Sequence, residues 1–139
     1  MDDAALTKVL LWILAARCGW AWIPDGINPS AAVRLFYGVI GTTPDEAVGV
    51  TVYGGSDELE NGLTARRVQL WHRGPTNAPD GADALAGASF AALQGLSRVG
   101  GINTAFRLNF AHLGADANGR QERSDNYQII IDNPEASHA

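Results

Sequence analysis

The sequence predicts an α+β fold in which an antiparallel or mixed sheet of about five strands carries two helices on one face. Two stretches repeat apolar residues at three- and four-residue steps, which is the spacing of an amphipathic helix. Shorter stretches alternate apolar and polar residues, as strands with one buried face do. The predicted order is a helix, three strands, a second helix and two strands, and both helices need an apolar sheet face to cover.

Length and composition indicate one folded domain that spans residues 1–139. Hydrophobic residues make up 46% of the chain and charged residues 18%, which excludes an intrinsically disordered protein. The formal net charge of -5 argues against a general nucleic-acid binder, because such proteins carry excess positive charge. The single cysteine, Cys18, excludes an internal disulfide and a cysteine-based metal cage.

The first residues predict neither a secretion signal nor a membrane anchor. The chain begins with two acidic residues after Met1, whereas a signal peptide needs a basic leader. The apolar run Val9–Ala16 is far shorter than the roughly 20 residues that cross a bilayer. We therefore expect a cytoplasmic protein that does not enter a membrane.

The first helix is predicted from Asp3 to Cys18, and it is apolar on nearly every side. Leu11 and Trp12 exceed what one sheet face can cover in a small domain. Two interpretations remain open: either another subunit covers this surplus, or the helix is a core helix inside the domain.

The connection 19–30 is predicted to be rich in turns and held in place by Trp20 and Trp22. A tryptophan pair can stack on a sugar or a base, but the sequence places no basic groove nearby. Packing against the core is therefore the favoured interpretation.

The central part of the chain predicts three strands, Val33–Ile40, Ala47–Tyr53 and Thr64–Arg73, followed by a helix over Asp80–Leu96. That helix has a stripe of small residues anchored by leucines. The segment 54–64 is polar and bounded by glycines, so we expect a long exposed loop. Its acidic residues are Asp57, Glu58 and Glu60.

The last part of the chain predicts two strands, Ala105–Leu113 and Tyr127–Asp132. Alternation in the first strand predicts one shared face for Phe106, Leu108, Phe110 and His112. The polar segment 114–126 is expected to form a second long loop, which carries Arg120, Arg123 and Asp125. The tail 133–139 is expected to be loose.

No arrangement of residues predicts catalysis or metal binding. The histidines His72, His112 and His138 lack a second ligand at metal spacing. His72 and His112 are candidates for a pair on adjacent strands, although sheet-lining histidines are commoner. No serine lies in a nucleophile-elbow sequence, and Lys8 is the only lysine. We predict a non-enzymatic protein without a metal or a cofactor.

One face of the predicted strand Thr64–Arg73 has no evident role inside the domain. It carries Arg67, Trp71 and Arg73, which we take, together with Leu11 and Trp12, as candidates for a subunit interface. Ion pairs across subunits are expected from these arginines and from Arg66, Arg120 and Arg123. Exposed pairs add only about 0–1 kcal/mol each, so they would set register and partner choice more than stability.

The order of these segments resembles that of the tail terminator, or tail completion, proteins of long-tailed bacteriophages. The resemblance covers nearly the whole chain. It rests on the apolar N-terminal helix and on RLFYGVI, the turn at Pro44-Asp45, VTVYGG, RRVQLWHRG, DALAGASFAALQGL and RSDNYQIII. The chain departs from the family pattern in the tryptophan-rich segment 19–30 and at Trp71-His72.

The resemblance implies a virion protein that is assembled in the host cytoplasm as a homohexameric ring at the head-proximal end of the tail. Such a ring caps the tail tube, ends its polymerisation and docks the tail onto the head. The implied partners are copies of itself, the major tail tube protein and the head–tail connector or stopper protein. No cofactor is implied, and viral DNA would pass through the lumen without specific binding. The candidates for contact with the tube or connector are the charged residues of the two predicted loops: Asp57, Glu58, Glu60, Arg120, Arg123 and Asp125.

Two other functions stay open on the sequence alone. A head-side connector, stopper or head-completion protein would share the ring form but lie on the portal. A small soluble ligand-binding domain would use the region of Trp20 and Trp22 as a pocket.

Overall fold

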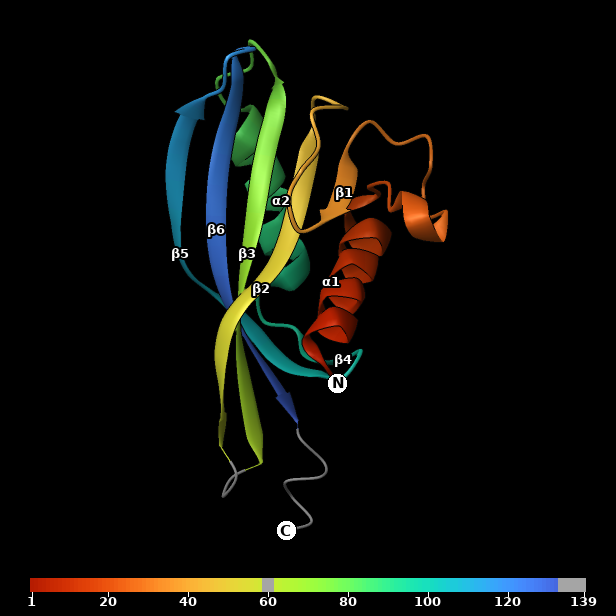
Figure 1. The fold of residues 1–139 in the computed structure, drawn as a ribbon, viewed down its shortest axis with the longest axis vertical. Coiled ribbons are helices and arrows are strands. Elements are labelled where there is room, and N and C mark those ends of the chain that lie inside the picture. Colours follow the sequence, from red (N-terminus) through yellow and green to blue (C-terminus); the bar gives the residue numbers. More distant parts are fainter. Residues whose placement is uncertain (59–61, 133–139) are drawn as a thin grey trace.

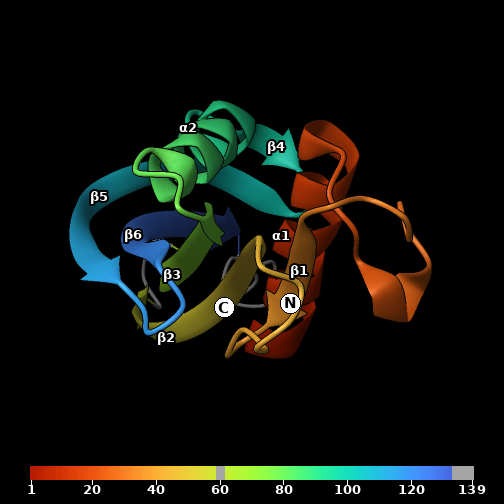
Figure 2. The ribbon, with the colours of Figure 1, turned by 90° about the horizontal axis from the view of Figure 1, so that it is seen from above.

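The computed structural model describes residues 1–58 and 62–132, which form a curled, six-stranded mixed sheet with two helices (Figures 1 and 2). The strand order is β1-β2-β3-β6-β5-β4, and only β1 and β2 run parallel. The helices are α1 (Asp3–Cys18) and α2 (Gly81–Leu93), with a short 3-10 helix η1 (Ile23–Asp25). The strands are β1 (Arg34–Tyr37), β2 (Ala47–Glu58), β3 (Leu63–Thr76), β4 (Ser97–Val99), β5 (Ile102–Ala115) and β6 (Arg120–Asp132).

The predicted fold class and element order are confirmed, with one short strand, β4, added after α2. Both helices pack on one face of the sheet, called here the inner face. On it α1 covers β1 and β2, while α2 covers β3 and β6. The helices also touch each other, so one continuous apolar core joins both of them to the sheet. No helix of the described residues is long and apolar enough to cross a membrane.

Helix α1 is a core helix along most of its surface. Asp2 caps its first turn by accepting a hydrogen bond from the Ala5 N–H at 2.7 Å, and Gly19 ends it in the left-handed conformation. Leu11 is 0% exposed, whereas its neighbour Trp12 is 56% exposed. Leu11 is therefore removed from the candidate interface, because the sheet and α2 cover more of α1 than the sequence suggested.

Helix α2 lies very close to the end of β3, and two glycines allow this approach. A Cβ atom on Gly74 would lie 2.7 Å from the backbone nitrogen of Ala82, and one on Gly81 would lie 2.7 Å from Pro75. The predicted stripe of small residues and leucines, including Ala86 and Ser89, is buried against the sheet. The small stripe thus serves close helix–sheet packing.

The connection between α1 and β1 is ordered by its two tryptophans, as predicted. Trp20 and Trp22 are both buried in the core, and the Trp22 indole N–H donates to Asp25 at 2.9 Å. The interpretation of this region as a ligand-stacking pocket is therefore wrong, because neither ring offers a free face.

Both predicted long loops are wrong, because strands occupy most of their length. Residues Gly54–Glu58 continue β2 past a β-bulge, and Arg120–Asn126 form the first half of β6. The glycine pair predicts the end of a strand, but here it lies within β2. Residues Gly54–Glu58 and their partners on β3 form the β2–β3 arm. Because these residues of β2 are exposed, the sequence there does not alternate between apolar and polar residues. In β6 the charged side chains Arg120, Arg123 and Asp125 form ion pairs within the protomer, so a polar sequence is compatible with a central strand. Glu60, His138 and the tail 133–139 lie outside the described residues.

We predict opposite effects of alanine at the two neighbouring positions of α1. Leu11→Ala should lower the free energy of unfolding by about 2–5 kcal/mol, because it leaves a cavity in the core. Trp12→Ala should change it by less than about 1 kcal/mol, since its ring already meets solvent. Urea unfolding of both variants measures this, and equal losses would contradict the assignment of Leu11 to the core and Trp12 to the surface.

Candidate assembly interface

The outer face of the sheet, opposite the helices, carries alternate side chains of β3 from Leu63 to Arg73. Within it, Arg67 is exposed and Trp71 is half-buried, with its indole N–H donating to Glu122 at 2.9 Å. Trp71 and Glu122 line a shallow groove with Val39, a residue that is 91% exposed. The segment before Ile40 passes so close over β2 that a Cβ at Gly49 would collide with the Gly38 carbonyl. Arg67 and Trp71 therefore stay candidates for a subunit contact.

Arg73 has an internal role that the sequence did not predict. Its side chain is buried and donates to two backbone carbonyls, from Nε to Asp45 at 2.8 Å and from Nη2 to Pro44 at 2.7 Å. The guanidinium thus holds the turn between β1 and β2 against the sheet. The sequence suggested Arg73 as an interface residue, but its side chain is therefore not available to a neighbouring subunit.

Arg120 fastens the same turn from the other side. It donates to the Asp116 carboxylate at 2.8 Å, to the Thr42 carbonyl at 2.9 Å and to Asp45 at 3.2 Å. Asp116 also accepts from the backbone N–H groups of Asn118 and Arg120, which closes a short turn between β5 and β6. Arg120 therefore bonds within the protomer and holds this turn in place, although the sequence suggested it as a residue for external contact.

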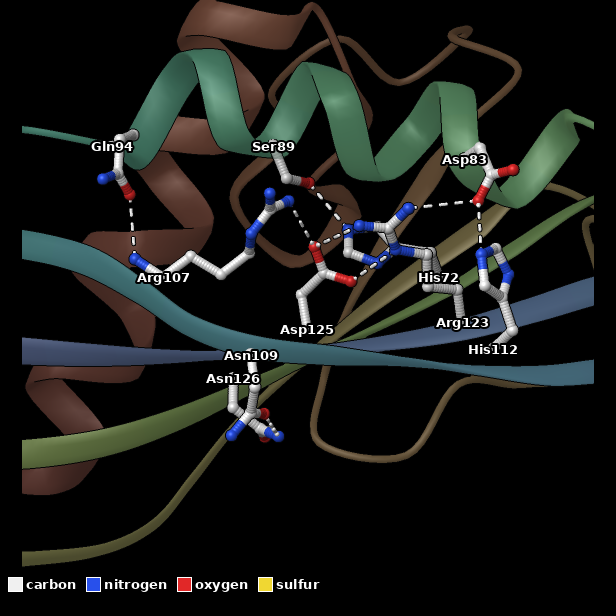
Figure 3. Close-up of polar contacts among 10 residues, drawn as sticks. All are labelled: His72, Asp83, Ser89, Gln94, Arg107, Asn109, His112, Arg123, Asp125 and Asn126. Atoms are coloured by element: carbon white, nitrogen blue, oxygen red, sulfur yellow. Dashed lines mark hydrogen bonds and ion pairs between the residues drawn. The ribbon is translucent and has the colours of Figure 1, made fainter.

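A cluster of buried charges lies between α2 and the inner face (Figure 3). Asp125 is 0% exposed, and it accepts from Arg123 Nε at 2.8 Å and from Arg107 at 3.2 Å. Arg123 also donates to Asp83 of α2 at 3.1 Å, and its guanidinium lies 4.0 Å from the centre of the Phe110 ring. Breaking such a buried pair costs about 3–5 kcal/mol, because the remaining charge has no partner. Arg123 and Asp125 are thus internal residues, and their assignment to an external contact loop is corrected.

The two strand histidines occupy separate places. In the sheet register both His72 and His112 lie opposite Arg123, so β6 separates them and they are not on adjacent strands. His72 is fully buried, with Nε2 2.8 Å from the Ser89 hydroxyl, and burial lowers its pKa to about 4. His112 is largely exposed and lies 3.5 Å from Asp83.

The acidic end of β2 is paired within the protomer. Arg66 donates to Asp57 at 2.8 Å and to Asp3 of α1 at 2.7 Å, which ties the β2–β3 arm to the start of the helix. These exposed groups contribute little stability but orient the arm. Glu58 lies on the exposed end of the same strand, whereas Glu60 is outside the described residues.

A second exposed patch lies beside Trp12. The ring borders a groove formed by α1, the end of η1, and the end of β4 with the turn that follows it. The lining residues are Lys8, Val9, Trp12, Ile13, Asp25, Val99 and Gly100. Trp12 therefore remains a candidate for a contact with another subunit.

The sequence did not predict that the large apolar residues of β5 are exposed. Phe106, Leu108, Phe110 and Leu113 are all exposed, although alternation predicted one shared face for the first three. A register shift between Arg107 and Asn109 places Phe106 opposite Gln128, on the outer face, and Phe110 opposite Asp125, on the inner face. The dense run of large apolar residues was the available signal, but a bulge cannot be located from alternation alone.

The described residues contain no cluster of metal ligands, and the cysteine is not activated as a nucleophile. Within residues 1–58 and 62–132, no three histidine, cysteine or acidic side chains gather as metal ligands. Burial raises the pKa of the Cys18 thiol to about 11, so the thiolate form is scarce near neutral pH. The exposed apolar and aromatic residues described above are instead of the kind found in contacts between proteins.

Comparison with known proteins yields one family and a matching fold. A family model described as "Bacteriophage tail terminator protein" matches residues 13–133. A chain of a solved structure titled "Virion of native gene transfer agent (GTA) particle" has a similar fold, with a TM-score of 0.65 and 17% sequence identity. That similarity covers 93% of this chain and 96% of the other. Comparison with curated protein sequences gives no match.

We predict that burial of neutral His72 makes stability depend on pH between about 6.5 and 4. The unfolded chain takes up this proton first as the pH falls, because the folded pKa is the lower one. The stabilisation is therefore fully present above about pH 6.5 and is lost as the pH falls towards about 4, by about 3 kcal/mol in total.

Urea unfolding at several pH values, with NMR titration of the imidazoles, tests this. His72→Gln should remove this part of the pH dependence, whereas the matched variant His112→Gln should keep it. A His72 ring that titrates near its ordinary pKa would contradict the prediction.

Proposed function

The chain belongs to the bacteriophage tail terminator family, and on that premise we propose that it forms a homohexameric ring that caps the tail tube. The family is structural, so the protein is a non-enzymatic component of the virion tail. In the proposed role the ring lies at the head-proximal end of the tail, ends tube polymerisation and joins the tail to the head connector. The match over residues 13–133 is the observation that carries this proposal, and it favours a terminator over a head-side connector.

A closed ring needs two different surfaces on each protomer, because its contacts are heterologous. The exposed candidates lie on separate parts of the molecule. Trp12 lies on α1, Arg67 and Trp71 lie on the outer face, and Phe110 and Leu113 lie on β5. Each contact should bury more than about 1,000 Å² in total to hold a stable ring.

The ends of the sheet suit contacts with two different partners. The β2–β3 arm projects from one end of the molecule, and the turn between β5 and β6 lies at the opposite end (Figure 1). In a ring whose axis runs roughly between these ends, one end meets the tube protein and the other meets the connector. Internal pairing by Arg66 and Arg120 keeps both ends in a defined position.

Viral DNA is proposed to pass through the lumen without specific binding. The net charge of -5 supports this, because tight binding to phosphates requires an excess of lysine and arginine. No cofactor takes part in the proposed role.

We predict that the purified chain assembles into rings of six. Sedimentation or mass photometry should give a particle six times the mass of the chain, and electron microscopy should show a central hole. A strictly monomeric mass at tens of micromolar, with no ring in assembled tails, would refute the proposal.

The two ends should have separable functions in tail assembly. We expect Leu63→Lys on the arm and Asn118→Lys at the opposite turn to act differently, because each adds a charge at only one end. In a phage that lacks the gene for this chain, one variant should give tails of abnormal length. The other should give tails of normal length that are not joined to heads.

Ala84→Lys, on the exposed side of α2, is the matched control and should restore normal virions. Tail lengths and head attachment are counted by electron microscopy. Normal, joined tails from both end variants would contradict the assignment of the ends to tube and connector.

A further inference from the structure

Two long strands, β2 and β5, extend beyond the short strands β1 and β4 that pair with them, and each is left with an open edge there. The first open edge belongs to β2. On the side away from β3, residues Ala47–Val50 pair with β1, and the Gly38 N–H donates to the Val50 carbonyl at 2.8 Å. From Val52 to Asp57, no residue of the described parts of the chain pairs with this side of the strand. The backbone groups that point outwards there are free to accept another strand.

The second open edge belongs to β5. On the side away from β6, β4 pairs with it as far as Thr104. The Gly95 N–H then donates to the Ala105 carbonyl at 2.9 Å, and the Gln94 side chain accepts from the Arg107 N–H at 2.8 Å. Beyond these caps, from Asn109 to Leu113, nothing in the described structure hydrogen-bonds to this side of the backbone.

The two open segments lie at opposite ends of the strands. The register places the open part of β5 level with the part of β2 that β1 covers. It places the open part of β2 level with the part of β5 that β4 and Gln94 cover. Each edge is therefore covered over one half and open over the other, in a diagonal arrangement.

The strand directions suit a head-to-tail contact between copies. β2 is antiparallel to β3, β3 to β6 and β6 to β5, so β2 and β5 run in opposite directions. A neighbour with the same orientation thus brings its β2 alongside β5 in the antiparallel sense. Joining the diagonal segments staggers successive sheets and tilts their strands, which is what closure of a sheet into a ring requires.

The side chains around the open segments are those that pairing would cover. Leu108, Phe110 and Leu113 are exposed beside the open part of β5, and Tyr53 is exposed on the open part of β2. An open edge flanked by exposed apolar residues promotes pairing with another chain. Because β1, β4 and Gln94 cover the other halves of β2 and β5, a neighbouring copy can pair only with the open halves.

We propose that the β5 segment Asn109–Leu113 of one protomer pairs antiparallel with the β2 segment Val52–Asp57 of the next copy, so that one sheet continues around the assembly. The proposal rests on the ring described under Proposed function and names the contact that builds it. It predicts that backbone hydrogen bonds, together with the apolar residues of β5, form the centre of the subunit interface.

Engineered cysteines test the contact directly. Ser56 and Asn109 both face the outer side of the sheet, as do Gly54 and Ala111, and each pair joins the two open segments in the same antiparallel register. The double variants Ser56→Cys/Asn109→Cys and Gly54→Cys/Ala111→Cys should form disulfides under mild oxidation. Non-reducing gels should then show a ladder from dimer to hexamer, and mixing the two single variants of a pair should give only dimers.

The control is Ser56→Cys combined with Ala84→Cys, an exposed position on α2, which should stay monomeric on the same gel. A ring of normal mass in which neither pair cross-links would overturn the edge contact and leave the ring intact. A chain that stays monomeric would overturn both the ring and the edge contact, so the two failures are distinguishable.

Hydrogen exchange provides a second measurement on the unmodified protein. Assembly should slow amide exchange at least tenfold in peptides that cover Asn109–Leu113 and Val52–Asp57, and it should leave the shielded segment Ala47–Val50 unchanged. Unchanged exchange in both open segments upon ring formation would overturn the proposal.

Discussion

The pairing of β3 with β6 is the constraint on which the rest of the structure depends. These two strands form the centre of the sheet, and their register runs almost without interruption from Leu63 and Asp132 to Arg73 and Glu122. Their inner faces supply Leu70, Tyr127 and Ile129 to the core, on which α2 lies. Because β3 and β6 each pair on both sides, the unpaired segments of the long strands lie on β2 and β5.

This arrangement explains why a central strand tolerates so many charges. Arg123 and Asp125 on β6 are buried, but each finds its partner on the inner face, where Asp83 and Arg107 complete the cluster. One end of the sheet is held in the same way, because Arg73 and Arg120 both bond to the turn that contains Asp45. The sequence suggested that these arginines form ion pairs between subunits, but in the structure they bond within one subunit and make it rigid. Trp12, the outer face around Arg67 and Trp71, and the exposed apolar residues of β5 remain the candidates for assembly contacts.

A rigid protomer with open edges is consistent with a virion component. A ring subunit must present its contact surfaces in a fixed geometry, because small angular errors accumulate around a closed assembly. The clamps formed by Arg66, Arg73 and Arg120 fix the arm and the turns relative to the sheet. Among the residues that the structure describes, no three histidine, cysteine or acidic side chains gather as metal ligands.

The sequence by itself determined the fold class, the two helices and the order of the elements apart from the short strand β4. These depend on periodicity, which is a local property of the chain. It also supported the family, since the order of segments spans nearly the whole chain. Local patterns failed where polar or glycine-containing segments pair as strands, as in Gly54–Glu58 and Arg120–Asn126.

Only the tertiary structure decided which residues are available for contact. Leu11 and Arg73 looked as accessible as Trp12 and Arg67 in the sequence, yet the first two are buried and the last two are exposed. The bulge in β5 that separates the faces of Phe106 and Phe110 likewise follows from pairing with β6. Burial, partner choice and register are set by segments distant in the chain, so no local pattern contains them.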